Sequence, residues 1–105
     1  MKRYACNLLL VSSSVALKEQ VVEIGSDGLC SVYYALDGEQ PSTEWLGGIF
    51  VLLPRDIHPE NEECLRTVWS RVVSNDVFIW RVWRISGVNL MNLDIDVPCY
   101  WHFLS

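Results

Sequence analysis

The chain has 105 residues, enough for one domain, and half of them are hydrophobic, which excludes an intrinsically disordered protein. Its net charge is −5 and no basic stripe is present, so we do not expect binding to nucleic acid or to an anionic membrane surface. No apolar run approaches the roughly 20 residues that a membrane-spanning helix needs.

The first predicted element is a strand over residues 4–11. Lys2 and Arg3, placed before the apolar residues 8–11, resemble the start of a secretory signal peptide. The apolar run is short, however, and the serines at positions 12–14 dilute it. We therefore predict a strand rather than a leader, and a cytoplasmic protein.

Further strands are expected over residues 18–24 and 29–36. The tight turn between them, at residues 25–28, contains the glycine and aspartate that supply the unusual dihedral angles of such turns. After a loop, residues 43–53 again have the pattern of a strand. The Gly47-Gly48 pair interrupts this strand and indicates a bulge, a bend or a close approach of the backbone.

A helix is predicted over about residues 61–74. It would bury one apolar stripe, which consists of Cys64, Leu65, Val68, Trp69, Val72 and Val73. Asn61 is suited to cap its start. Glu62 and Glu63 fall in its first turn, where the helix dipole favours negative charge.

Two more strands, over residues 77–85 and 88–95, and a short apolar tail at residues 99–104 complete the chain. The order of elements predicts a single domain over residues 1–105. Its fold class is mainly β: a small, mainly antiparallel β-sandwich or roll with one helix packed on it.

The four cysteines are far apart in the sequence: Cys6, Cys30, Cys64 and Cys99. A four-cysteine zinc site usually contains close pairs, so this spacing does not favour one. Two disulfides would be open to a secreted chain. We expect reduced thiols that are mostly buried, because free cysteine is among the most buried residue types.

Two segments resemble one known family. The first covers residues 4–53, with their Asp27-Gly28 turn and the run STEWLGGIFV at residues 42–51. It resembles the N-terminal strands of the metal-dependent amidohydrolase superfamily, in which a small β-sandwich, the composite domain, flanks a catalytic TIM barrel. The second, residues 85–95, contains the run GVNL and is similar to the C-terminal strands that return to that sandwich.

This resemblance implies the accessory sandwich of the family without its catalytic half. Only about 30 residues separate the two segments, whereas a barrel needs on the order of 250. We therefore expect a non-enzymatic accessory domain that has no cofactor and that self-associates or binds a protein partner.

The alternative is a minimal metal-dependent hydrolase, or one that a partner completes, with zinc as its metal. Aligned without gaps from Gly48, the family's histidine pair falls on His58 and Glu60, and Asp56 falls where the family often has aspartate or asparagine. These residue types bind zinc, but a catalytic site needs three protein ligands plus water. Because Pro59 interrupts the extended backbone, an exposed polar loop is the simpler interpretation.

A cysteine nucleophile is the other enzymatic option, with Cys64 near the helix N-terminus and His58 as its base. The apolar stripe places Cys64 in the core, and no third residue that would orient the histidine is evident. A buried structural cysteine is therefore the expected role.

The five tryptophans are many for a small core. Trp80 and Trp83 fall on opposite faces of the strand predicted over residues 77–85, and Phe78 shares a face with Trp80. One such face would meet solvent or a partner, so these three residues are the predicted interface, with a homo-oligomer as the simplest assembly. The alternatives are a monomer whose helix covers this surface and a ligand-binding chain with an aromatic-lined pocket.

Overall fold

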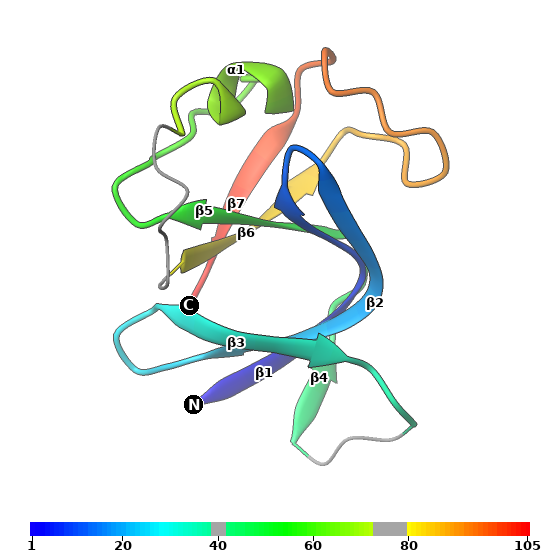
Figure 1. Ribbon diagram of the computed structural model, residues 1–105, viewed down its shortest axis with the longest axis vertical. Helices are drawn as coiled ribbons and strands as arrows, with labels where there is room; N and C mark the ends of the chain where they lie inside the picture. Colours follow the sequence, from blue (N-terminus) through cyan, green and yellow to red (C-terminus); the bar gives the residue numbers. More distant parts are fainter. Residues whose placement is uncertain (39–41, 73–79) are drawn as a thin grey trace.

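The computed structural model describes residues 1–38, 42–72 and 80–105 (Figure 1). These residues form seven strands and one short helix, which confirms the prediction of a mainly β fold with one packed helix. In chain order the elements are β1 (Lys2–Ser12), β2 (Val15–Ile24), β3 (Cys30–Ala35), β4 (Thr43–Trp45), β5 (Ile49–Pro54), α1 (Leu65–Trp69), β6 (Trp80–Ser86) and β7 (Tyr100–Leu104).

All seven strands belong to one mixed sheet that curls and closes on itself. Around the ring, β1 pairs with β2, β2 with β3, β3 with β6, β6 with β5, and β5 with β1. Most pairings are antiparallel, whereas β4 and β5 both run parallel to β1. The predicted sandwich or roll is thus a single curled sheet, and β4 and β7 lie outside the ring as additional strands.

Gly47 and Gly48 form the bend that the sequence indicates between β4 and β5. Both have positive φ angles, 70° and 81°, which glycine adopts without strain. The bend lets β4 follow the first half of β1 and β5 follow the second half. The side chain of Asn7 secures it, because its Oδ1 accepts the backbone N–H of Gly48 at 2.6 Å.

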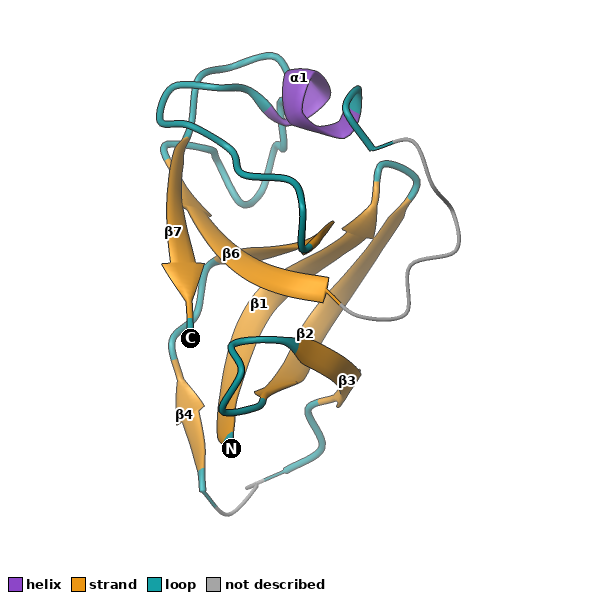
Figure 2. Ribbon diagram, turned by 90° about the vertical axis from the view of Figure 1, so that its left-hand side faces the viewer, coloured by secondary structure: helices purple, strands orange, loops and turns teal. Residues whose placement is uncertain are grey.

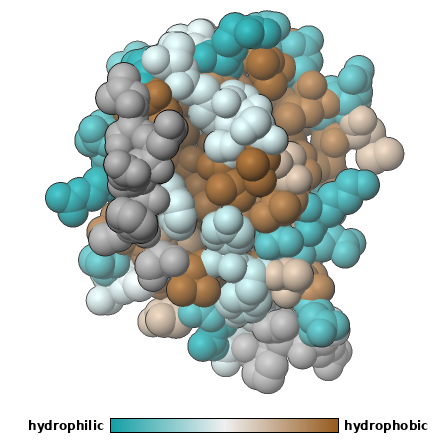
Figure 3. Space-filling model, viewed as in Figure 1, coloured by the Kyte–Doolittle hydropathy of each residue, from teal (hydrophilic) through white to brown (hydrophobic). Residues whose placement is uncertain are grey.

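The strand β5 is buried on both faces and separates two hydrophobic clusters. Phe50 and Leu52 point into the ring, whereas Ile49, Val51 and Leu53 point to the other face, which α1 and the loop before β7 cover. A strand buried on both faces needs an uninterrupted apolar run, which explains why this segment shows no polar alternation. On the face seen in Figure 3, apolar residues reach the surface in the middle, and hydrophilic residues mostly lie around them.

The helix is shorter than the predicted span of residues 61–74. It covers Leu65–Trp69, and its buried residues, Leu65 and Val68, belong to the predicted stripe. The segment before it is held by β7 instead of continuing the helix. The backbone N–H of Glu62 donates to the carbonyl of Cys99 at 2.9 Å, and the φ of Glu62 is 73°, outside the helical range.

The strand predicted over residues 88–95 is wrong, because this segment is a loop between β6 and β7. Two side chains form local turns in this loop. Oδ1 of Asn89 accepts the backbone N–H of Met91 at 2.8 Å, and Oδ1 of Asp94 accepts that of Asp96 at 2.9 Å. Its apolar residues still pack against the core that α1 covers; they are Val88, Leu93 and Ile95. The apolar pattern here therefore reflects burial and not a strand.

Two predictions fall partly on residues 73–79, which lie outside the described ranges: the end of the helix and the start of the strand over residues 77–85. The described part of that strand is β6, and the predicted apolar tail at residues 99–104 contains β7. None of the described helical segments is long and apolar enough to cross a membrane.

Candidate functional site

The three residues of the predicted metal site, Asp56, His58 and Glu60, follow β5 and are exposed. Within residues 1–38, 42–72 and 80–105, no three histidine, cysteine, aspartate or glutamate side chains lie close enough to hold a metal ion together. His58 instead lies against Arg81, whose Nη1 atom is 3.5 Å from Nδ1 and 3.4 Å from Nε2 of the imidazole. Because the guanidinium is equally near both ring nitrogens, its positive charge opposes a metal ion there.

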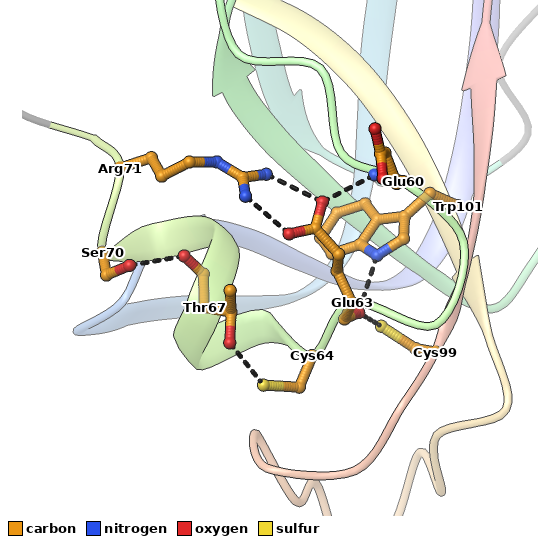
Figure 4. Close-up of polar contacts among 8 residues, drawn as sticks. All are labelled: Glu60, Glu63, Cys64, Thr67, Ser70, Arg71, Cys99 and Trp101. Atoms are coloured by element: carbon orange, nitrogen blue, oxygen red, sulfur yellow. Dashed lines mark hydrogen bonds and ion pairs between the residues drawn. The ribbon is translucent and has the colours of Figure 1, made fainter.

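Cys64 does not have the core position that the helical stripe predicts, because it precedes α1 and is only half-buried. Its Sγ atom lies 3.1 Å from the hydroxyl oxygen of Thr67 (Figure 4). This hydrogen bond is the main reason why the pKa of the Cys64 thiol is below its usual value. No described hydrogen bond joins Cys64 to His58, so the structure does not assemble the nucleophile pair. The other three cysteines are buried, and none of the four forms a disulfide.

Glu63 ties the segment before α1 to β7, as Figure 4 shows. Its carboxylate accepts hydrogen bonds from the guanidinium of Arg71 and from the backbone N–H of Glu60. Its backbone carbonyl accepts Nε1–H of Trp101 at 2.9 Å and the thiol of Cys99 at 3.2 Å. The Arg71 contact lowers the pKa of the Glu63 carboxyl, and burial raises the pKa of Cys99 to about 11. Since these groups satisfy one another, the cluster has a structural role.

The residues of the predicted interface do not share one exposed surface. Trp83 is 9% exposed and belongs to the core that α1 covers. Trp80 is half-buried, with its ring edge-on to that of Tyr33 at 6.2 Å. Phe78 lies outside the described residues. The large aromatic side chains that the structure shows exposed are Trp45 at 53%, Tyr100 at 48% and Phe103 at 43%.

Phe103 lies between a charged and an aromatic neighbour on one face of β6 and β7. The guanidinium carbon of Arg81 lies 5.5 Å from the centre of the Phe103 ring, and the ring of Trp83 lies 5.2 Å from it. Arg81 and Trp83 are on the same face because they are two residues apart on β6, and Phe103 is paired with Trp83 across the strands. We call Arg81, Phe103, Trp83 and the contacting His58 the edge stack.

The strand β7 is an edge strand, because β6 is its only partner among the described strands (Figure 2). The backbone N–H of Trp101 points away from β6, since it donates to Oδ1 of Asn61 at 3.3 Å. This direction alternates along an antiparallel strand, so the N–H and C=O groups of Phe103 also point away from β6. Asn61 covers the edge at Trp101, and Glu62 covers Cys99, the residue just before β7; no hydrogen bond of the described residues reaches the outward groups of Phe103.

No sequence motif marks Arg81 or Phe103 as a candidate site residue. The aromatic run at residues 100–103 is typical of a strand and is the signal that could have identified β7. No sequence signal shows that this strand lies at an edge, or that Arg81 contacts an aromatic ring instead of a carboxylate. Both the edge position and this contact depend on which distant segments meet in the fold.

No protein-family model, no curated protein and no solved structure matches this chain. The resemblance to the amidohydrolase composite domain therefore stays a prediction. The features of the described residues that point to a function are the open edge of β7 and the edge stack beside it.

Proposed function

We propose that this chain is a non-enzymatic protein-interaction module that binds through the open edge of β7. The observation that carries the proposal is the outward direction of the Phe103 N–H and C=O groups, for which the described residues provide no partner. An extended segment of another chain can pair with such an edge, because the main-chain hydrogen bonds themselves supply affinity.

The side chain of Phe103 supports the same assignment. It is 43% exposed, although it is large and apolar, and it lies at the open part of the edge. Proteins usually protect an open edge with charges, proline or a covering segment. Here Asn61 covers the edge at Trp101 and Glu62 covers Cys99 just before the strand, so an added strand would find both a free backbone and an aromatic contact at Phe103.

The open part of the edge is short, and this sets the kind of binding to expect. The open groups lie at Phe103, because Asn61 already uses the N–H of Trp101 and Lys2 Nζ donates to the backbone oxygen of Ser105. A small contact of this type buries little surface, which is typical of weak and transient complexes. We therefore expect reversible binding of short extended segments and not a permanent assembly.

Peptide selection followed by a single-atom change in the edge tests the proposal. A phage-displayed library of random short peptides is selected on the immobilised native chain. The enriched peptides are then titrated against two semisynthetic proteins, each made by ligating residues 1–63 to a synthetic segment that begins at Cys64. One protein carries an N-methyl group on the backbone nitrogen of Phe103, which removes the outward N–H and keeps the ring. The matched control is N-methylated at Leu90, in the exposed loop between β6 and β7.

We expect the control to bind the peptides like the native chain. The protein methylated at Phe103 should lose about tenfold in affinity or more, since one edge hydrogen bond is gone. Equal binding to both proteins contradicts the proposal, as does the absence of any peptide enriched over an unrelated immobilised protein. A native dimer that dissociates on methylation of Phe103 would support edge binding with a second copy as the occupant.

A further inference from the structure

The geometry points to an acidic extended segment as the occupant of the β7 edge, with Arg81 binding a carboxylate of that segment. This inference rests on the proposed function, because it names the chemistry of the partner at the same edge. It starts from the contacts of Arg81, which lies beside the open end of the strand.

Arg81 differs from the other arginines that make described polar contacts. Those arginines reach carboxylate or carbonyl oxygens; they are Arg3, Arg66, Arg71 and Arg84. Within the described residues, the guanidinium of Arg81 contacts only two rings, those of His58 and Phe103. The chain carries 13 acidic side chains against 8 basic ones, so a half-buried guanidinium whose described contacts include no oxygen atom is an exception that calls for an external partner.

The two rings hold the guanidinium but leave its main hydrogen-bonding capacity unused. A guanidinium above an aromatic ring is held through its face, and its N–H donors point outward in its own plane. The imidazole of His58 lies against the same group and restricts it further. An arginine fixed in this way presents the planar fork that accepts a carboxylate in two hydrogen bonds, and it loses little side-chain freedom on binding.

The position of Arg81 matches a strand added to β7. Arg81 lies on the face of the sheet that carries Phe103, and Phe103 is the residue whose backbone groups are open. An added strand would run about 4.8 Å beyond β7, and alternate side chains would lie on this same face, next to Phe103. A glutamate or aspartate at such a position would extend toward the guanidinium.

Charge argues against a second copy of this chain as the occupant. In a twofold pairing of two open edges, the segments around Phe103 and Ser105 of both copies would lie side by side. Lys2 lies near this edge, because its Nζ donates to the backbone oxygen of Ser105 at 2.9 Å. Lys2 and Arg81 of one copy would then approach the same two residues of the other copy. Like charges across an interface oppose association, whereas an acidic segment neutralises both groups.

Peptide selection on three proteins tests the inference: the native chain, Arg81→Gln and Arg55→Gln. Arg55 is exposed, follows β5 directly and gives the same change in net charge, so it is the matched control. We expect aspartate or glutamate to dominate one position of the peptides selected on the native chain and on Arg55→Gln. Peptides selected on Arg81→Gln should show no acidic preference.

Affinity measurements on one selected peptide give the size of the effect. Exchange of its acidic residue for the corresponding amide should weaken binding to the native chain by about tenfold or more, because a bidentate charge-assisted contact is lost. The same exchange should weaken binding to Arg81→Gln by less than about twofold, since the coupling between the two groups is already absent.

An acidic preference that persists on Arg81→Gln overturns the inference, and so do peptides selected on the native chain without such a preference. In both cases the proposal of edge binding stands if N-methylation of Phe103 still weakens the binding of those peptides. The two proposals therefore fail separately. A native dimer formed through β7 also overturns the inference. Arg81→Glu supplies a second variant: it should select lysine or arginine at the same position, and an acidic preference in this variant contradicts the role of Arg81.

Discussion

The side-chain oxygen of Asn61 accepts the backbone N–H of Trp101 at 3.3 Å, across 40 residues of sequence. This contact covers the edge of β7 at Trp101, and the hydrogen bond from Glu62 to Cys99 covers the residue just before the strand, whereas no described residue bonds to the outward groups of Phe103. One polar side chain in the segment between β5 and α1 thus sets how much of the strand a partner can reach.

Replacement of Asn61 by alanine should lower the free energy of unfolding by about 1 kcal/mol, because the N–H of Trp101 loses its acceptor. Urea unfolding followed by tryptophan fluorescence measures this change. Asn92→Ala is the control, since Asn92 is exposed in the loop before β7 and has no described hydrogen bond. If Asn61→Ala is as stable as the control, water satisfies the Trp101 amide equally well and the side chain has no role in closing the edge.

The ion pair of Glu63 with Arg71 should make stability depend on pH in the acidic range. Arg71 lowers the pKa of the Glu63 carboxyl in the folded chain, whereas the pKa of a glutamate in the unfolded chain is about 4.3. The ionised carboxylate therefore stabilises the fold above about pH 4, and this contribution is lost as the pH falls through the lower folded pKa. Glu63→Gln should cost no more than about 1 kcal/mol at neutral pH, because the pair is partly exposed.

Urea unfolding at a series of pH values checks this expectation. The stability difference between the native chain and Glu63→Gln should shrink toward low pH. Glu62→Gln, which removes an exposed carboxyl without a described ion pair, should show no such trend. A difference for Glu63→Gln that stays constant down to about pH 2 would mean that the charge of Glu63 does not matter to folding.

Cys64 should be the first thiol to react with iodoacetamide. Its pKa is lowered by the Thr67 hydroxyl, whereas burial raises the pKa of Cys6 and of Cys99 to about 11 and also raises that of Cys30. The thiolate is the reactive form, so Cys64 should be alkylated at least about 100-fold faster than the two thiols with the highest pKa. Mass spectrometry of peptides after a short exposure at neutral pH identifies the modified residue.

Thr67→Val is the matched variant for this prediction, because it removes the hydroxyl and keeps the shape of the side chain. It should slow alkylation of Cys64 and leave the slow rates of the other thiols unchanged. Faster modification of Cys99 than of Cys64 would contradict the burial on which the prediction rests.

The strands that the sequence predicts well are those with local signals. Alternating residues and the turn at residues 25–28 identify β2 and β3, and the uninterrupted apolar run before Pro54 identifies β5. Local signals do not show which strands pair with each other. The parallel arrangement of β1 with β4 and β5 depends on contacts such as that between Asn7 and Gly48, two residues that are 41 positions apart in the sequence. No local pattern encodes which of these segments meet.

The helix start and the exposure of Trp83 also differ from the prediction because of contacts between distant segments. The stripe from Cys64 to Val72 fits a helix, but the backbone N–H of Glu62 donates to Cys99, just before β7, and α1 begins only at Leu65. Trp83 fits an exposed face of its strand, but β7 and α1 cover it, and their positions follow from the whole fold. The candidate site depends on the position of β7 at the edge of the sheet, which no local pattern encodes.

Amide hydrogen exchange along β7 in the free protein, followed by NMR, tests the open edge most directly. We predict slow exchange at His102 and Leu104, whose N–H groups point toward β6, and fast exchange at Phe103 between them. Exchange at Phe103 as slow as at its two neighbours, in a protein shown to be monomeric, would contradict the open edge and the binding mode built on it.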